Sequence, residues 1–152
     1  METATLEKVL EEHPLFRGMK EKHLQTLVGS STVVRFEPGD VIFEEGEPAH
    51  HCYVIRTGKV ALQLVSYRIE PFTLMTLEEG DIIGWSWLFP PYRWKFTARA
   101  LTVIRAISLD AGSVRARCDE DHDLGYELMK RFAQVIENRV EALSVHIVAV
   151  EK

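Results

Sequence analysis

Cysteine, positive charge and long apolar runs are all scarce in this 152-residue chain. Its two cysteines, Cys52 and Cys118, come without secretory features, so we expect reduced thiols and assign them no role. With a net charge of −5, the chain has no excess of basic residues that would bind the phosphate backbone of a nucleic acid. No apolar stretch approaches a membrane span, and the acidic start METATLEKVLEEH lacks the features of a signal peptide. We therefore expect a cytoplasmic protein without a direct nucleic-acid or membrane partner.

Motifs for catalysis and metal binding are missing as well. The chain contains no nucleophile elbow, Walker motif, paired-carboxylate motif or HExxH pattern. His50, His51 and Cys52 are metal-ligand residue types, but neighbours in a strand point to opposite faces and no second pair has zinc spacing. The four acidic residues between positions 119 and 123 lack the glycine of a calcium loop and favour a helix start. The sequence predicts no enzyme, no metal site and no cofactor.

Apolar patterning along the chain predicts a single domain over residues 1–152. Helical spacing is present over 1–30, broken by a proline and a glycine. Residues 31–109 alternate short β-branched or aromatic runs with turns such as EPGD, RTGK and EEGD, which is typical of a sandwich or barrel of short antiparallel strands. Helical periodicity returns over 110–152. The predicted fold class is mainly β with flanking helices.

The last predicted helix carries more apolar surface than a small β-domain needs for its cover. Its apolar residues recur at helical spacing and form one predicted stripe: Leu128, Phe132, Ile136, Val140, Leu143, Ile147 and Val150. A plain core helix is one interpretation of this stripe. We favour the other, in which the surplus stripe packs against a second copy and makes the protein a homodimer.

All three tryptophans lie in one short segment, GDIIGWSWLFPPYRWKFTARA, which spans Gly80–Ala100. Trp85 and Trp87 follow its second glycine closely, and Trp94 stands between two cations, Arg93 and Lys95. Binding pockets are usually apolar with a few polar anchors, so this segment is the candidate site.

Two stretches resemble the cyclic-nucleotide-binding domain family. FEPGDVIFEEGEPAHHCYVIRTGKVAL is similar to the front half of that domain, and LEEGDIIGWSWLF is similar to its Gly-Asp-x-x-Gly-Glu phosphate-binding segment. ARALTVIRAISLD matches the strand that follows. The resemblance covers about residues 14–140. It implies a double-stranded β-helix, the jelly-roll-like β-roll of the catabolite activator protein type, with a final helix that packs on a second subunit and relays ligand occupancy.

The match departs from the family pattern at the residues that would hold the ligand. Trp85 stands where the family has the glutamate that grips the ribose, and Trp87 stands where it keeps a small residue near the phosphate. A match without gaps puts Trp94 at the position of the phosphate arginine. A gap in the loop would bring Arg93 or Lys95 there instead, and both alignments stay open.

These observations predict a small-molecule-sensing regulatory domain of the cyclic-nucleotide-binding fold. Two ligand classes stay open: a cyclic nucleotide, and another anionic or aromatic molecule that replaces the conventional one. The alternative is a dimerisation or protein-interaction module whose pocket the tryptophans plug. No DNA-binding, kinase or channel segment follows, so we expect a stand-alone domain. The candidate ligand-binding residues are Gly84, Trp85, Ser86, Trp87, Leu88, Arg93, Trp94, Lys95 and Thr97.

Overall fold

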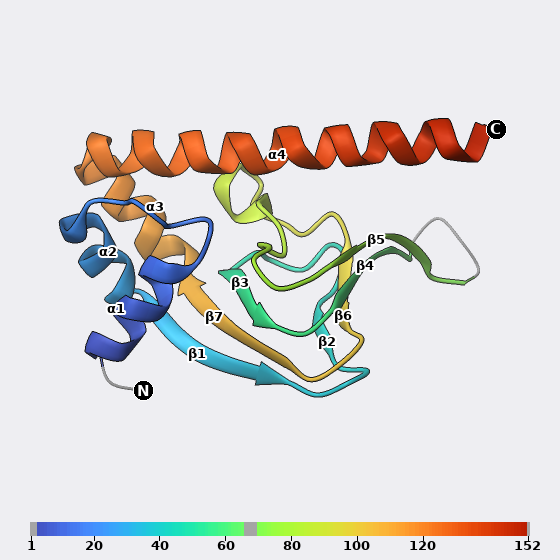
Figure 1. The fold of residues 1–152 in the computed structure, drawn as a ribbon, viewed down its shortest axis with the longest axis horizontal. Helices are drawn as coiled ribbons and strands as arrows, with labels where there is room; N and C mark the ends of the chain where they lie inside the picture. The colour runs from blue at the N-terminus through green and yellow to red at the C-terminus, as the bar shows by residue number, and fades with distance from the viewer. Residues whose placement is uncertain (1–2, 66–69, 152) are drawn as a thin grey trace.

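Two antiparallel sheets occupy the middle of the chain, with helices α1 to α3 gathered at one end of them and α4 across the top (Figure 1). The computed structural model describes residues 3–65 and 70–151, with side chains described over 5–65 and 70–145. The helices are α1 (Thr3–Glu12), α2 (Glu21–Val28), the 3₁₀ turn η1 (Ser86–Leu88), α3 (Ala111–Glu120) and α4 (His122–Glu151). The strands are β1 (Ser31–Phe36), β2 (Val41–Phe43), β3 (His51–Thr57), β4 (Val60–Leu64), β5 (Phe72–Leu77), β6 (Thr97–Ala100) and β7 (Ile104–Asp110).

The chain crosses repeatedly between the two sheets. One sheet has the strand order β1-β7-β3 and the other has the order β2-β6-β4-β5. Successive strands such as β3 and β4, or β6 and β7, therefore lie in different sheets. This alternation is the double-stranded β-roll that the resemblance implied, so the predicted fold class is confirmed.

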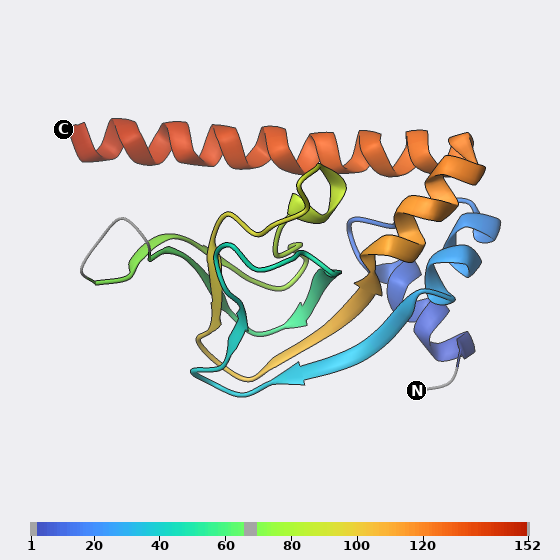
Figure 2. The same cartoon turned by 180° about the vertical axis from the view of Figure 1, so that it is seen from behind.

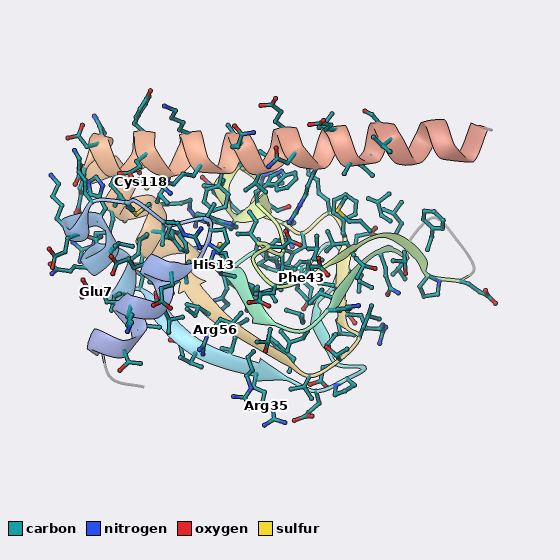
Figure 3. All side chains as sticks on the ribbon, in the orientation of Figure 1. Glu7, His13, Arg35, Phe43, Arg56 and Cys118 are labelled. Carbon is teal, nitrogen blue, oxygen red and sulfur yellow. The ribbon has the colours of Figure 1, made fainter. Side chains whose placement is uncertain are left out.

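Apolar residues that face inward from both sheets form the core. Cys52 and Val54 of β3 alternate with half-buried neighbours, as a strand with one covered face requires. The register pairs Val54 with Ile107, which brings β3 and β7 together in the core. Phe43 of β2, labelled in Figure 3, closes the same interior on the side toward α4.

One turn shows why its glycine is required. Gly58 separates β3 from β4 with a φ of 107°, which side chains other than glycine rarely tolerate. A Cβ atom at this position would lie 2.4 Å from the carbonyl oxygen of Val103. The RTGK motif therefore marks a tight link between the sheets.

Helix α4 runs across the top of the β-roll, as Figures 1 and 2 show from opposite sides. Asp110 caps the helix before it, because its Oδ1 accepts from the Ser113 backbone N–H at 2.8 Å. Helix α4 has 30 residues and begins six residues before Leu128, the first residue of the predicted stripe. Among the described residues, no helix combines the length and apolar character needed to cross a bilayer.

The predicted apolar stripe is divided between two faces of α4. Leu128 and Phe132 are buried in the core. Ile136 is only half buried and Val140 is 58% exposed, because helical spacing turns them away from the β-roll. The side chains of Ile147 and Val150 lie outside the described residues.

Candidate ligand site

The tryptophan segment is fixed to β3 before it reaches the first tryptophan. The backbone N–H of Ile55 donates to the Asp81 carbonyl at 2.9 Å, and that of Ile83 donates to Tyr53 at the same distance. Ile82 and Ile83 are then buried beside the core. These bonds fix the start of the tryptophan segment, Gly84 and Trp85, relative to β3.

Trp87 packs in the core. It is 1% exposed, and its ring meets Phe132 of α4 edge-on with centroids 5.3 Å apart. Its indole N–H lies beside the Cys52 thiol without a conventional hydrogen bond. Burial raises the pKa of Cys52 to about 12, so this thiol stays protonated at neutral pH.

Trp94 lies in a segment that is held to residues 46–48 by backbone hydrogen bonds and an isolated bridge, without forming a regular strand. Its backbone N–H donates to Glu47 at 2.9 Å, and its carbonyl accepts from Gly46 at 2.7 Å. The indole stacks on Phe43 with centroids 3.7 Å apart and planes 7° apart. A Cβ atom at residue 84 would lie 2.9 Å from Trp94 Cζ3, so Gly84 makes room for this ring.

The two cations beside Trp94 lie at the exposed rim of the site. Arg93 and Lys95 are both exposed. Arg93 Nη1 donates to the Gly46 carbonyl at 2.9 Å, which holds this side chain at the edge of the loop. The pairing therefore sets an aromatic ring inside and two positive charges at the rim.

A cavity of about 180 Å³ lies between this segment and α4. Six candidate residues line it together: Gly84, Trp85, Ser86, Arg93, Trp94 and Lys95. Trp87, Leu88 and Thr97 do not line it. Thr97 Oγ1 instead accepts from the Glu45 backbone N–H at 3.1 Å. The remaining lining residues are Phe43, Leu62, Leu74, Met75, Ile83, Phe89, Pro90, Pro91, Phe96, Arg139 and Leu143.

Helix α4 contributes Arg139 and Leu143 to the cavity, and both were missed as site residues. The Arg139 guanidinium lies 5.0 Å from the centroid of the Trp85 ring and donates to the Ile82 carbonyl. Burial lowers its pKa to about 10, which leaves it charged at neutral pH. The available signal was a cation at helical spacing from Phe132, on the face that turns toward the core.

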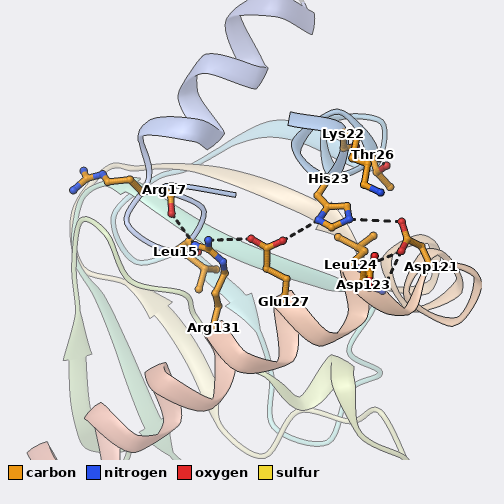
Figure 4. Close-up of polar contacts among 10 residues, drawn as sticks. All are labelled: Leu15, Arg17, Lys22, His23, Thr26, Asp121, Asp123, Leu124, Glu127 and Arg131. Carbon is orange, nitrogen blue, oxygen red and sulfur yellow. Dashed lines mark hydrogen bonds and ion pairs between the residues drawn. The ribbon is translucent and has the colours of Figure 1, made fainter. Parts of the chain in front are cut away.

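The first turns of α4 are tied to the N-terminal helices by a polar network (Figure 4). His23, only 1% exposed, donates through Nδ1 to Glu127 at 2.9 Å, and its Nε2 lies 3.6 Å from Asp121. Arg131 bonds Glu127 at 3.1 Å and also donates to the Leu15 carbonyl at 2.8 Å. Partial burial acts to raise the pKa of Glu127, but the hydrogen bonds from His23 and Arg131 hold it below its usual value.

The family model described as "Cyclic nucleotide-binding domain" matches residues 33–121. The chain belongs to this family, which confirms the resemblance found in the turn and strand motifs. Members of the family are regulatory domains that bind small molecules.

Particular relatives agree with this assignment. The CRP-like cAMP-activated global transcriptional regulator of Mycobacterium tuberculosis is 24% identical over 129 residues, covering 85% of this chain. The chain spans 58% of that relative's length. A cyclic nucleotide-binding domain from Methylobacillus flagellatus KT has a TM-score of 0.79 at 16% identity, covering 97% of this chain and 83% of the other. The N-terminal domain of a transcriptional regulator from Streptomyces coelicolor A3(2) has a TM-score of 0.68 at 27% identity, covering 89% and 94%.

Proposed function

We propose that this chain is a small-molecule-sensing regulatory domain whose ligand is not a conventional cyclic nucleotide. The observation that carries the proposal is the cavity between the β-roll and α4, to which the helix itself contributes Arg139 and Leu143. A molecule in this cavity touches both parts at once. Occupancy therefore changes the free energy with which α4 packs on the β-roll.

The residues around the cavity support a ligand other than a cyclic nucleotide. Among the described residues that line the cavity there is no Asp or Glu, so none of them offers a carboxylate to accept a ribose hydroxyl bond. In the match without gaps, Trp94 stands at the position of the phosphate arginine, and its ring is buried and stacked on Phe43. The cavity of about 180 Å³ is also smaller than the roughly 300 Å³ at the low end of ordinary ligand pockets.

The regulatory role, as opposed to a catalytic one, is supported by the relatives, which include a transcriptional regulator. We include a cytoplasmic location in the proposal because regulators of this kind act there. Direct nucleic-acid contact is not part of the proposed role, since the chain carries a net charge of −5.

A homodimer through α4 is the second element of the proposal. Met129 is 39% exposed and Val140 is 58% exposed, and with Ile136 they lie within a narrow angle on the helix surface. This face, which we call the outer stripe (Met129, Ile136 and Val140), lies beside the face of α4 that carries Arg139 and Leu143. A second copy bound to the outer stripe would be moved by any shift of α4. In the alternative function, where the tryptophans plug the pocket, the same face would form the dimer without a ligand.

Hydrogen exchange measured by mass spectrometry tests the sensing role. Peptides covering residues 133–145 are compared with and without cyclic AMP, cyclic GMP, benzoate, phenylacetate and indole-3-acetate. At least one compound is expected to slow exchange there while leaving the β3 peptides unchanged, because the ligand bridges the β-roll and the helix. If compounds bind without any change in residues 133–145, the sensing role is wrong.

A further inference from the structure

The cavity has the dimensions of a single aromatic ring with a small substituent. An engineered cavity of about 150 Å³ in another protein, lined by aliphatic and aromatic side chains, holds one benzene molecule. The cavity here is slightly larger, at about 180 Å³. Aromatic side chains reach it from several directions: Phe43, Trp85, Phe89, Trp94 and Phe96. Aromatic rings pack favourably on one another in offset or edge-on geometry, so these walls favour an aromatic guest.

The charges at the cavity are all positive. Arg139 lines it from α4 and forms no ion pair with a described residue. One of its N–H groups is used at the Ile82 carbonyl, which leaves donors of its five available to a guest. Asp81 is the acidic residue that acts on Arg139 through space. Arg93 and Lys95 add positive charge at the exposed rim.

We propose that the cavity binds an aromatic monocarboxylate, with its ring among the aromatic side chains and its carboxylate on Arg139. The guanidinium and the carboxylate match as planar groups that form paired hydrogen bonds. A neutral aromatic guest supplies no opposite charge to the partly buried guanidinium of Arg139. A cyclic nucleotide brings ribose hydroxyls for which the lining offers no carboxylate.

This inference rests on the proposed sensing function and names its ligand class and its charged contact. Since Arg139 belongs to α4, the bond to the carboxylate joins the ligand directly to the helix. The acid and its neutral amide should therefore differ in how strongly they hold α4 to the β-roll, as well as in affinity.

Calorimetry with matched pairs tests the ligand class. Benzoate, phenylacetate and indole-3-acetate are each compared with the corresponding amide. The acids are expected to bind about ten- to hundredfold more tightly than the amides, as expected for a hydrogen bond to a charged group. Arg139→Gln should remove most of this preference, and Arg139→Lys should restore part of it. Circular dichroism and melting temperature verify that each variant is folded.

Lys130→Gln is the matched control, because it removes one positive charge from an exposed position on α4 that does not line the cavity. It should leave the preference for acids within about twofold, as a screened surface charge contributes little. Equal losses in Lys130→Gln and Arg139→Gln would show a general field effect and overturn the assignment to Arg139. Equal binding of acids and amides by the unmodified protein overturns it too.

Failure of this inference and failure of the sensing function give different results. If cyclic AMP binds and slows exchange over residues 133–145 while no acid binds below about 1 mM, the ligand class is wrong and sensing stands. If the acids bind through Arg139 and exchange over 133–145 does not change, the ligand class stands and sensing is wrong. If no compound produces binding or a change in exchange, both are wrong for this cavity.

Discussion

The two halves of α4 are held in different ways. Up to Phe132 the helix is anchored, because Leu124 and Leu128 are buried and Glu127 and Arg131 bond the N-terminal region. Beyond that residue the helix faces a cavity on one side and solvent on the other, and Val140 is 58% exposed. The first half belongs to the core, whereas the second half rests on a site that a guest can fill.

This difference assigns separate tasks to one continuous helix. Segments with few buried contacts open at lower free energy than the core, so the second half is the part that a ligand can stabilise. We therefore expect a ligand to change the packing of the second half more than that of the anchored first half. Substitutions in the first half should change folding, and those in the second half should change association and ligand response.

The largest expected effect is that of Phe132→Ala. It removes a buried ring that packs on Trp87, and comparable truncations lower the free energy of unfolding by about 3–5 kcal/mol. Leu143→Ala in the second half should lower it by no more than about 1.5 kcal/mol, because Leu143 is only half buried. Urea denaturation measures both. Equal losses of unfolding free energy in the two variants would contradict the proposed difference between the two halves of α4.

A pH dependence of about 3 kcal/mol is expected from His13, which lies in the turn beneath the anchored half and is labelled in Figure 3. Burial lowers its pKa from 6.5 to about 4, while Asp81 acts in the opposite direction and Arg17 adds to the lowering. Between these two pH values the unfolded chain binds a proton that the folded chain does not. Stability therefore falls as the pH drops from 6.5 to 4.

His13→Asn isolates this contribution, because asparagine offers an acceptor to the Leu15 N–H, as Nδ1 does at 3.1 Å, and does not titrate. Urea denaturation between pH 7 and pH 4 should show a shallower pH dependence in the variant. The same slope in both proteins would assign the loss to other groups.

Glu127→Gln should lower the free energy of unfolding at pH 7 by about 1.5–3 kcal/mol, because it replaces a carboxylate bonded by His23 and Arg131. The lowered pKa of Glu127 means that its contribution is present above about pH 4.3 and is lost as the pH falls through the folded-state value. The variant and the unmodified protein should therefore converge in strongly acidic solution. Glu137→Gln, at an exposed position on the same helix, is the matched control and should change stability little.

The smallest effect on folding is expected at the outer stripe. Met129→Asp with Val140→Asp places two charges on the proposed dimer face, and light scattering should then report a monomer. The unfolding free energy of that monomer should change by only about 0.5 kcal/mol at an exposed site such as Val140. Val145→Asp adds charge on the opposite side of α4 and should leave the dimer intact. An unmodified protein that is already monomeric at high concentration contradicts the proposed dimer.

The fold was predictable because its signals are local. Turns such as the one at Gly58 and the alternation in β3 can be recognised from a few neighbouring residues. The cavity was less predictable, because it depends on which way each tryptophan points. Trp87 stands between a serine and a leucine and Trp94 stands between two cations, and these neighbours do not reveal that Trp87 packs under α4 and Trp94 stacks on Phe43.

The sequence pattern could not predict that α4 contributes residues to the cavity. Arg139 is 45 positions after Trp94, and only the path of the chain brings both to one cavity. The apolar stripe was seen as one face because a repeat of three and four residues drifts slowly around a straight helix. That drift separates Phe132, which is buried, from Val140, which is exposed.

The succession of Arg93, Trp94 and Lys95 places one aromatic wall and two positive rim charges of the cavity within three residues. A change in the path of this one segment would therefore alter the shape and the charge of the cavity together.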